Sequence, residues 1–327
     1  MKSLFIIALE NVELELSIAR GIRFVDTHFI TNNKQTVLNL ITSDFRFVFG
    51  EMETQHILDA PAVIYSIVEH KEPFPNELAA VTFLSSNLKL VQAFLMCLWL
   101  QKDNSVNFDL GFLVHPYGDK SIPNFHSSSR NVRFSNAIGE IVVTKFGESE
   151  IKTARNILTN LFGMQIDYED LKVVQSIFGE EVSRVERSFY FAQIARGSSN
   201  FGLKVANYVT CFESIFCTDT AELSHKLAER LALFVGDSET ERLDIYKNMK
   251  RAYNIRSKIV HGDKVSKKSN SEFKDICLYC DNMLRRTFEK ILTSKEEIEF
   301  FKCESSELEE YFLRLLFNKD QEKKSNR

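Results

Sequence analysis

Apolar and polar residues alternate with a period of two in two segments of the first half of the chain, residues 12–17 and 45–49. Such alternation is typical of half-buried strands, because successive side chains of a strand point to opposite faces. Residues 106–114 and 138–146 are rich in valine, isoleucine and phenylalanine and also predict strands. We therefore predict four strands, one of which places Phe45, Phe47 and Phe49 on a single face.

Residues 76–101 predict one long helix that is apolar on nearly all sides and packs centrally in its domain. Residues 115–129 contain many turn-forming residues and predict a loop. From about residue 151 onward the strand patterns fade and helical spacing takes over. Helices are predicted at 150–162, 168–194, 200–217, 221–235, 239–261, 271–292 and 306–317.

This order of elements predicts the α+β class, with a mixed α/β domain followed by an all-α helical bundle. The mixed domain is expected over residues 1–165 and the bundle over 175–295. Residues 296–327 are expected to form a C-terminal helix and a charged, frayed tail.

Composition restricts where the protein acts. The first ten residues are too short an apolar stretch for a signal peptide, and the most apolar segment, residues 91–100, is too short to span a bilayer. Six cysteines fall mostly within apolar runs, so we expect a soluble cytoplasmic protein with reduced thiols and no membrane partner. The net charge of −4 excludes a uniformly basic nucleic-acid coat, so any contact with nucleic acid must use a local patch.

One such patch lies between residues 247 and 268. Eight basic residues and a single acid, Asp263, give it a local charge of +7, which leaves −11 for the remainder. A polyanion partner and a solvated helix face with a lysine-rich loop are equally weighted explanations. As RNA-binding candidates we select Lys250, Arg251, Lys258 and Lys264.

The same segment contains two residues suited to phosphodiester chemistry. Arg256 offers planar, permanently charged donors that match phosphate oxygens, and His261 can transfer a proton near neutral pH. Gly262 suits the position just past a helix end, and Ser269 with Glu272 predicts a capping box that opens the next helix. Because RNA supplies its own 2′-OH nucleophile, this chemistry requires neither metal nor cofactor.

Helical geometry makes convergence of the two side chains within one chain poor. Five residues of helix correspond to a rotation of about 140° and a rise of about 7.5 Å. Two chains around a two-fold axis could instead bring two arginines and two histidines into one cleft.

The segment Arg256–His261, with four residues between arginine and histidine, resembles the signature of the HEPN superfamily. Tyr253 and Gly262 beside it, and the upstream runs Cys211–Phe216 and Glu222–Ala232, resemble the Apea-like branch of that superfamily. The similarity extends over roughly residues 180–292.

This resemblance implies a dimeric HEPN-type helical bundle and a metal-independent endoribonuclease in prokaryotic antiviral or abortive-infection defence. It implies His261 as acid and base and Arg256 as phosphate binder. Ser257, Tyr253 and Glu213 would support them. The implied partners are RNA, such as tRNA or phage or host transcripts, and a second copy of the chain. The alternative is a non-catalytic HEPN module for dimerisation or RNA binding.

Other combinations have simpler explanations. Cys277 and Cys280 form a C-x-x-C pair within a helical apolar run, which favours core packing over a redox or zinc role. His225 lies beside leucines, which favours a half-buried histidine over a ligand. Glu213 needs a cationic partner, either Arg230 or Arg256.

His115, Asp119 and His126 could hold a metal or a small ligand, but their spacing matches no established site. We therefore expect them to lie in an ordinary surface loop. No glycine-rich phosphate loop or other motif of a small-molecule enzyme occurs in the N-terminal half.

Overall fold

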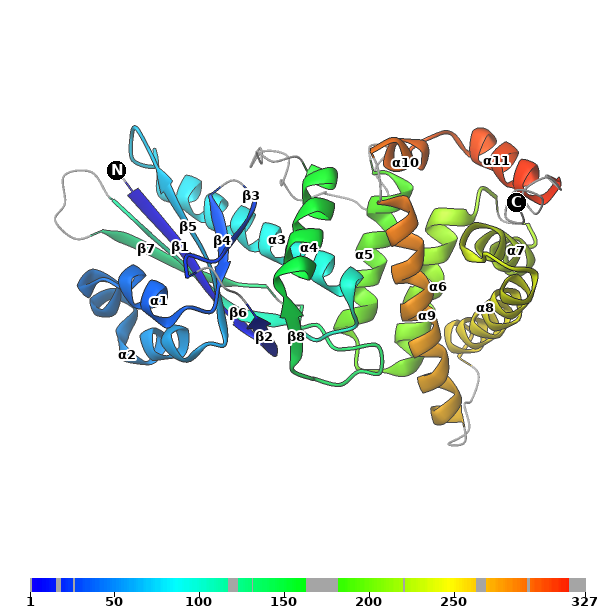
Figure 1. Ribbon diagram of the computed structural model, residues 1–327, viewed down its shortest axis with the longest axis horizontal. Helices are drawn as coiled ribbons and strands as arrows, with labels where there is room; N and C mark the ends of the chain where they lie inside the picture. The colour runs from blue at the N-terminus through cyan, green and yellow to red at the C-terminus, as the bar shows by residue number, and fades with distance from the viewer. Residues whose placement is uncertain are drawn as a thin grey trace. The chain divides into compact units, whose positions relative to one another are not determined.

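A computed structural model describes most of the chain (Figure 1). The described residues are 2–15, 19–25, 27–116, 123–130, 132–162, 182–219, 221–262, 269–292 and 295–317. They form two compact units. The first contains the described residues up to 136 and from 140 to 162, and the second contains 137–139 and the described residues from 182 onward. The first unit has an antiparallel sheet and the second is helical, so the predicted α+β class is confirmed.

The first unit is built around a six-stranded sheet in which every neighbouring pair is antiparallel. In spatial order its strands are β3 (Ile22–Val25), β4 (His28–Thr31), β5 (Ala62–Glu69), β1 (Lys2–Glu10), β6 (Asn107–His115) and β7 (Asn124–Ser129). The run Phe5–Leu9 of β1 is buried throughout, which is why it forms an interior strand covered on both faces. A separate parallel pair joins β2 (Val12–Glu15) to β8 (Thr144–Gly147).

Helices cover the two faces of this sheet. Ile6 and Ala8 of β1 face a core shared with α1 (Lys34–Leu40) and α2 (Ser43–Asp59). On the other face α3 (Glu77–Gln101) approaches so closely that a Cβ at Gly111 would lie 2.5 Å from the side chain of Leu88. The helix α4 (Glu148–Phe162) packs against α3, and its residues Ile151, Ala154 and Leu158 are fully buried.

Among the helices of the described residues, α3 alone is long and apolar enough to cross a membrane by length and composition. However, 67% of its most apolar window is buried inside the protein. Burial of this kind is typical of the core helix of a soluble protein, and the prediction that this segment packs centrally is confirmed. Its first turn begins after Asn76, whose side chain accepts the Ala79 N–H.

The predicted strand at residues 45–49 is wrong, because the segment lies within α2. The Thr42 hydroxyl accepts the Phe45 N–H and caps the helix. Phe45 and Phe49 satisfy both periods, since residues four apart share a face in a strand and in a helix. Their rings pack 4.6 Å apart, whereas Phe47, which a strand would place beside them, is 79% exposed.

Two further predictions need correction. Of residues 138–146, only the end is strand, in β8, while Ile141 and Val143 are exposed on irregular backbone. The predicted loop at 115–129 is partly strand, because His115 ends β6 and residues 124–129 form β7. The strand at 138–146 was predicted from apolar composition, and the loop at 115–129 was predicted from turn-forming residues. In both segments the pairing of strands decided the observed structure.

The second unit is a helical bundle, and its helices within 200–292 confirm the prediction. They are α5 (Arg184–Gly197), α6 (Phe201–Phe216), α7 (Leu223–Val235), α8 (Glu239–Val260), α9 (Ser269–Ile291), α10 (Lys295–Phe300) and α11 (Ser305–Phe317). The helix α6 contacts α5, α7, α8 and α9. The short helix α10 was not predicted, and of the helix predicted at 168–194 the part 168–181 lies outside the described residues.

A fully buried histidine of the first unit, His28, should make this unit sensitive to acid. His28 donates from Nε2 to the Asn87 amide oxygen, and burial lowers the pKa of His28 from 6.5 to about 4. The unfolded chain therefore takes up a proton below pH 6.5 that the folded protein excludes. Stability is present above pH 6.5 and is lost as the pH falls towards 4.

We predict that His28→Asn removes this dependence, although the variant is less stable at neutral pH. Between pH 6.5 and 4 the parent should lose about 3 kcal/mol of unfolding free energy that the variant does not lose. Urea unfolding followed by fluorescence of Trp99, the single tryptophan and a buried residue of α3, reports on this unit. An equally steep loss of stability in the variant would contradict the prediction.

Candidate functional site

The helix α8 carries the candidate residues at its C-terminal end. Its N-terminus is capped by Ser238, whose hydroxyl accepts the Glu241 N–H. Ile245, Met249 and Ala252 are buried, and their spacing of four and three residues forms one apolar face. This face fixes the rotation of α8 about its axis and hence which of the later residues are exposed.

The helix ends where the sequence predicts. The His261 N–H donates to the Ser257 carbonyl at 3.0 Å, and Gly262 follows with φ of +75°. No atom lies within 4 Å of a Cβ built at Gly262, so the backbone angle rather than lack of space favours glycine there. The His261 side chain is exposed immediately beyond the last helical turn.

Arg256 belongs to a small cluster with Glu213 of α6 and Tyr253 of α8, which we call the Arg256 cluster. The Arg256 Nη2 donates to the Glu213 Oε2 at 3.4 Å, and its guanidinium carbon lies 5.6 Å from the centre of the Tyr253 ring. The side chains of Arg256 and Glu213 are 26% and 15% exposed. Of the two partners considered for Glu213, the structure therefore selects Arg256.

Glu213 is only partly stabilised in this cluster. Burial raises the pKa of the Glu213 carboxyl above its ordinary value, and the positive charge of Arg256 opposes that shift. Its Oε1 is buried and has no hydrogen-bond partner among the described residues. Burial, followed by the Glu213 charge, also raises the pKa of Tyr253. A long ion pair with one unsatisfied oxygen is weakly held, so the Arg256 guanidinium can accept a competing anion.

His261 and Arg256 are not joined within one chain. In the described part of the protein, no hydrogen bond or ion pair links their side chains. This agrees with the rotation of about 140° expected for five residues of helix. The structure therefore brings Glu213, Tyr253 and Arg256 together and leaves His261 separate from them. The Ser257 backbone carbonyl accepts the His261 N–H at the end of the helix and takes no part in the Arg256 cluster.

The predicted RNA-binding residues differ in their surroundings. Lys250 is partly exposed and Lys258 is exposed on α8, whereas Lys264 lies outside the described residues. Arg251 donates to Glu272 of α9 at 2.9 Å. Both partners of that pair are more than 40% exposed. The carboxylate partner in such a weak surface pair is easily replaced by another anion. Glu272 was expected to complete a capping box with Ser269, whose side chain lies outside the described residues.

The sequence did not predict the hydrogen-bond partners of Arg230. Its side chain is 3% exposed, and its guanidinium donates to the Phe216 carbonyl at 2.7 Å and to Glu309 of α11. No sequence signal connects α7 to α11, because these partners are 79 residues apart. The side chain of His225, which was predicted to be half-buried, is 52% exposed and is hydrogen-bonded to the Tyr246 hydroxyl.

The remaining candidates do not form a metal site in the described residues. Cys277 and Cys280 are buried, and burial raises the pKa of Cys277 to about 12, which favours the thiol; the core prediction is confirmed. His115 and His126 stack with ring centres 5.3 Å apart on β6 and β7, while Asp119 lies outside the description. Within the described ranges, no group of three or more histidine, cysteine or acidic side chains could hold a metal ion.

Comparison with known proteins finds no matching family model, no similar curated protein and no similar solved structure. The case for function therefore comes from the geometry of α8 and its neighbours.

We predict that Gly262→Ala destabilises the second unit by about 1–2 kcal/mol, because alanine is strained at positive φ. Gly262→Asn should cost less, since asparagine tolerates this backbone conformation better. Urea unfolding followed by circular dichroism measures the change, with the Trp99 fluorescence transition as an internal control for the first unit. Equal stability of parent and Gly262→Ala would show that the helix end is not held in this conformation.

Proposed function

We propose that the second unit is a metal-independent endoribonuclease of the HEPN type in a cytoplasmic antiviral or abortive-infection defence system. The observation that supports this most is the end of α8, where an exposed His261 follows a partly buried Arg256 and an exposed Lys258 on the same helix. The exposure of His261 agrees with a role in which its imidazole reaches a ribose-phosphate chain.

In this proposal the chemistry is an internal transesterification of RNA. His261 accepts the proton of a ribose 2′-OH, and the resulting oxygen attacks the adjacent phosphorus. The bond from phosphorus to the 5′-oxygen breaks, and a protonated histidine returns a proton to that oxygen. The products are a 2′,3′-cyclic phosphate and a 5′-OH end. Arg256 stabilises the negative charge that develops on the phosphoryl oxygens.

Two chains would supply the complete site in this scheme. Since Arg256 and His261 of one chain are separated around the helix, a two-fold axis near the C-terminal end of α8 would place them beside those of a second copy. Lys250, Arg251, Lys258 and Lys264 would then contact the backbone of a bound RNA.

A non-catalytic HEPN module is the second candidate, and one observation favours it. Arg256 is held by Glu213 rather than oriented beside His261, which is the arrangement of a structural ion pair. In this case the unit binds RNA or dimerises through the same surface without cleaving its ligand.

Cleavage in EDTA distinguishes these candidates. We expect the purified full chain to cut RNA into fragments with 2′,3′-cyclic phosphate ends and to leave DNA of the same sequence intact. His261→Ala and Arg256→Ala should each reduce the rate roughly 100-fold or more. His225→Ala is the matched control, because it removes an exposed histidine elsewhere in the same unit. If His261→Ala cuts as fast as the parent, the assigned role is wrong.

The Arg256 cluster generates a second expectation. Glu213→Gln removes the carboxylate charge that competes with phosphate for Arg256, so RNA affinity should rise about two- to fivefold. Fluorescence anisotropy with labelled single-stranded RNA at low salt measures this change. Glu310→Gln is the control, because it removes an exposed carboxylate that pairs with Arg314 on α11. Weaker or unchanged binding by Glu213→Gln would place the cluster outside the RNA surface.

A further inference from the structure

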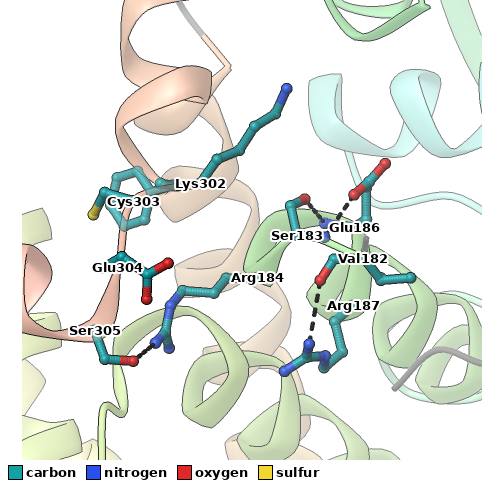
Figure 2. Close-up of a pocket in the computed structure, with 10 residues that line it drawn as sticks. Val182, Ser183, Arg184, Glu186, Arg187, Lys302, Cys303, Glu304 and Ser305 are labelled. Carbon is teal, nitrogen blue, oxygen red and sulfur yellow. Dashed lines mark hydrogen bonds between the residues drawn. The ribbon is translucent and has the colours of Figure 1, made fainter. Parts of the chain in front are cut away.

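A cavity of about 450 Å³ lies in the second unit between the start of α5 and the connection from α10 to α11 (Figure 2). Its polar lining includes Ser183, Arg184, Arg187, Lys302, Glu304 and Ser305. None of these residues belongs to the candidate site on α8. The volume is within the range of pockets that hold small organic ligands, about 300–1,000 Å³.

Arg184 is the most informative residue of the cavity. Figure 2 shows its side chain reaching from α5 to Ser305, to whose hydroxyl it donates from Nη2. Its Nη1 donates to the Cys217 carbonyl at 2.7 Å. Both acceptors are neutral, and no ion pair to a carboxylate is found for Arg184 in the described chain. Burial, followed by the nearby charge of Arg187, lowers the pKa of Arg184.

A partly buried cation without a counter-ion is electrostatically unfavourable, and an anion in the cavity would relieve this cost. Two further cations, Arg187 and Lys302, line the same space. The Arg187 Nη2 donates to the Val182 carbonyl at 3.2 Å, which holds its side chain at the start of α5. Lys302 pairs with Glu299 at 2.7 Å, but both side chains are about half exposed or more and this pair is weak.

The two acidic residues of the lining do not neutralise its three cations. Glu186 accepts the Ser183 N–H at 2.8 Å and so completes the capping box of α5. Glu304 is exposed at the start of α11. Three cations and two carboxylates therefore line the cavity, and one carboxylate is engaged in capping. The N-terminal end of the thirteen-residue helix α11 adds a favourable dipole.

We propose that this cavity binds a small molecule through a phosphate group, independently of the RNA chemistry proposed for α8. The guanidinium of Arg184 and the ammonium of Lys302 would contact the phosphoryl oxygens, since planar guanidinium donors match phosphate geometry. The space beyond a phosphate group is sufficient for a ligand of the size of a nucleoside monophosphate. Inorganic phosphate and such a monophosphate share the chemistry that the lining recognises.

Calorimetric titration of the full chain tests the proposal with three probes: inorganic phosphate, adenosine 5′-monophosphate and adenosine. Phosphate and the monophosphate should both bind, and tighter binding of the monophosphate would identify an organic phosphate as the preferred ligand. Adenosine should not bind detectably. Absence of binding by phosphate and monophosphate at millimolar concentration, or equal binding of adenosine and its monophosphate, would overturn the proposal.

Two variants of the cavity lining, one that removes a positive charge and one that removes a negative charge, test whether phosphate binds in the cavity. Lys302→Ala should weaken binding roughly tenfold, whereas Glu304→Gln should tighten it about threefold. Both side chains are exposed, so neither change threatens the fold. Arg184→Gln should weaken binding at least as much as Lys302→Ala. If loss of the Arg184 hydrogen bond to the Cys217 carbonyl prevents folding, Lys302→Ala and Glu304→Gln still show whether phosphate binds in the cavity.

Two controls separate this site from the one on α8. Arg256→Ala should bind the monophosphate as the parent does, even where it loses RNA cleavage. Arg314→Ala removes an exposed cation from α11 outside the cavity and should also bind normally. Parent-like affinity in both Lys302→Ala and Glu304→Gln would show that phosphate binds elsewhere.

Discussion

The second unit depends on how the C-terminal end of α6 is satisfied. The last carbonyls of a helix lack partners within it and carry partial negative charge. At the end of α6 two arginines supply the missing donors: Arg230 of α7 binds the Phe216 carbonyl and Arg184 of α5 binds the Cys217 carbonyl. Because α6 also contacts α8 and α9, this end connects most of the bundle. It carries Glu213 of the Arg256 cluster and adjoins the cavity through Arg184.

Three arginines around this end differ in how fully their charge is compensated. Arg230 is buried and pairs with Glu309, whose pKa is lowered by the Thr218 hydroxyl and then by Arg230 itself. Arg256 has a long contact to Glu213, and Arg184 has only neutral acceptors among the described residues. Incomplete compensation, as at Arg256 and Arg184, leaves a cation able to bind an anionic ligand, whereas the charge of Arg230 is already paired.

The two units also differ in how far local patterns could predict them. Helices of the second unit follow from apolar residues three and four apart, a pattern contained within each helix. In the first unit the same local pattern supports two outcomes. Phe45 and Phe49 share a face in either a strand or a helix, and only the packing of α2 over the sheet, with Phe47 left in solvent, distinguishes them. The strands β4 and β5 likewise depend on partners distant in sequence.

By itself the sequence determined the α+β class, the end of α8 at His261 and Gly262, and the presence of cationic side chains along that helix. These features rest on spacing, on the conformational freedom of glycine and on composition, all of which act over a few residues. Only the tertiary structure decided that Glu213 pairs with Arg256 across 43 residues and that Arg184 meets Ser305 across 121. Side chains so distant in the chain meet only after whole helices have packed, and no local pattern encodes which of several cations will face a given carboxylate.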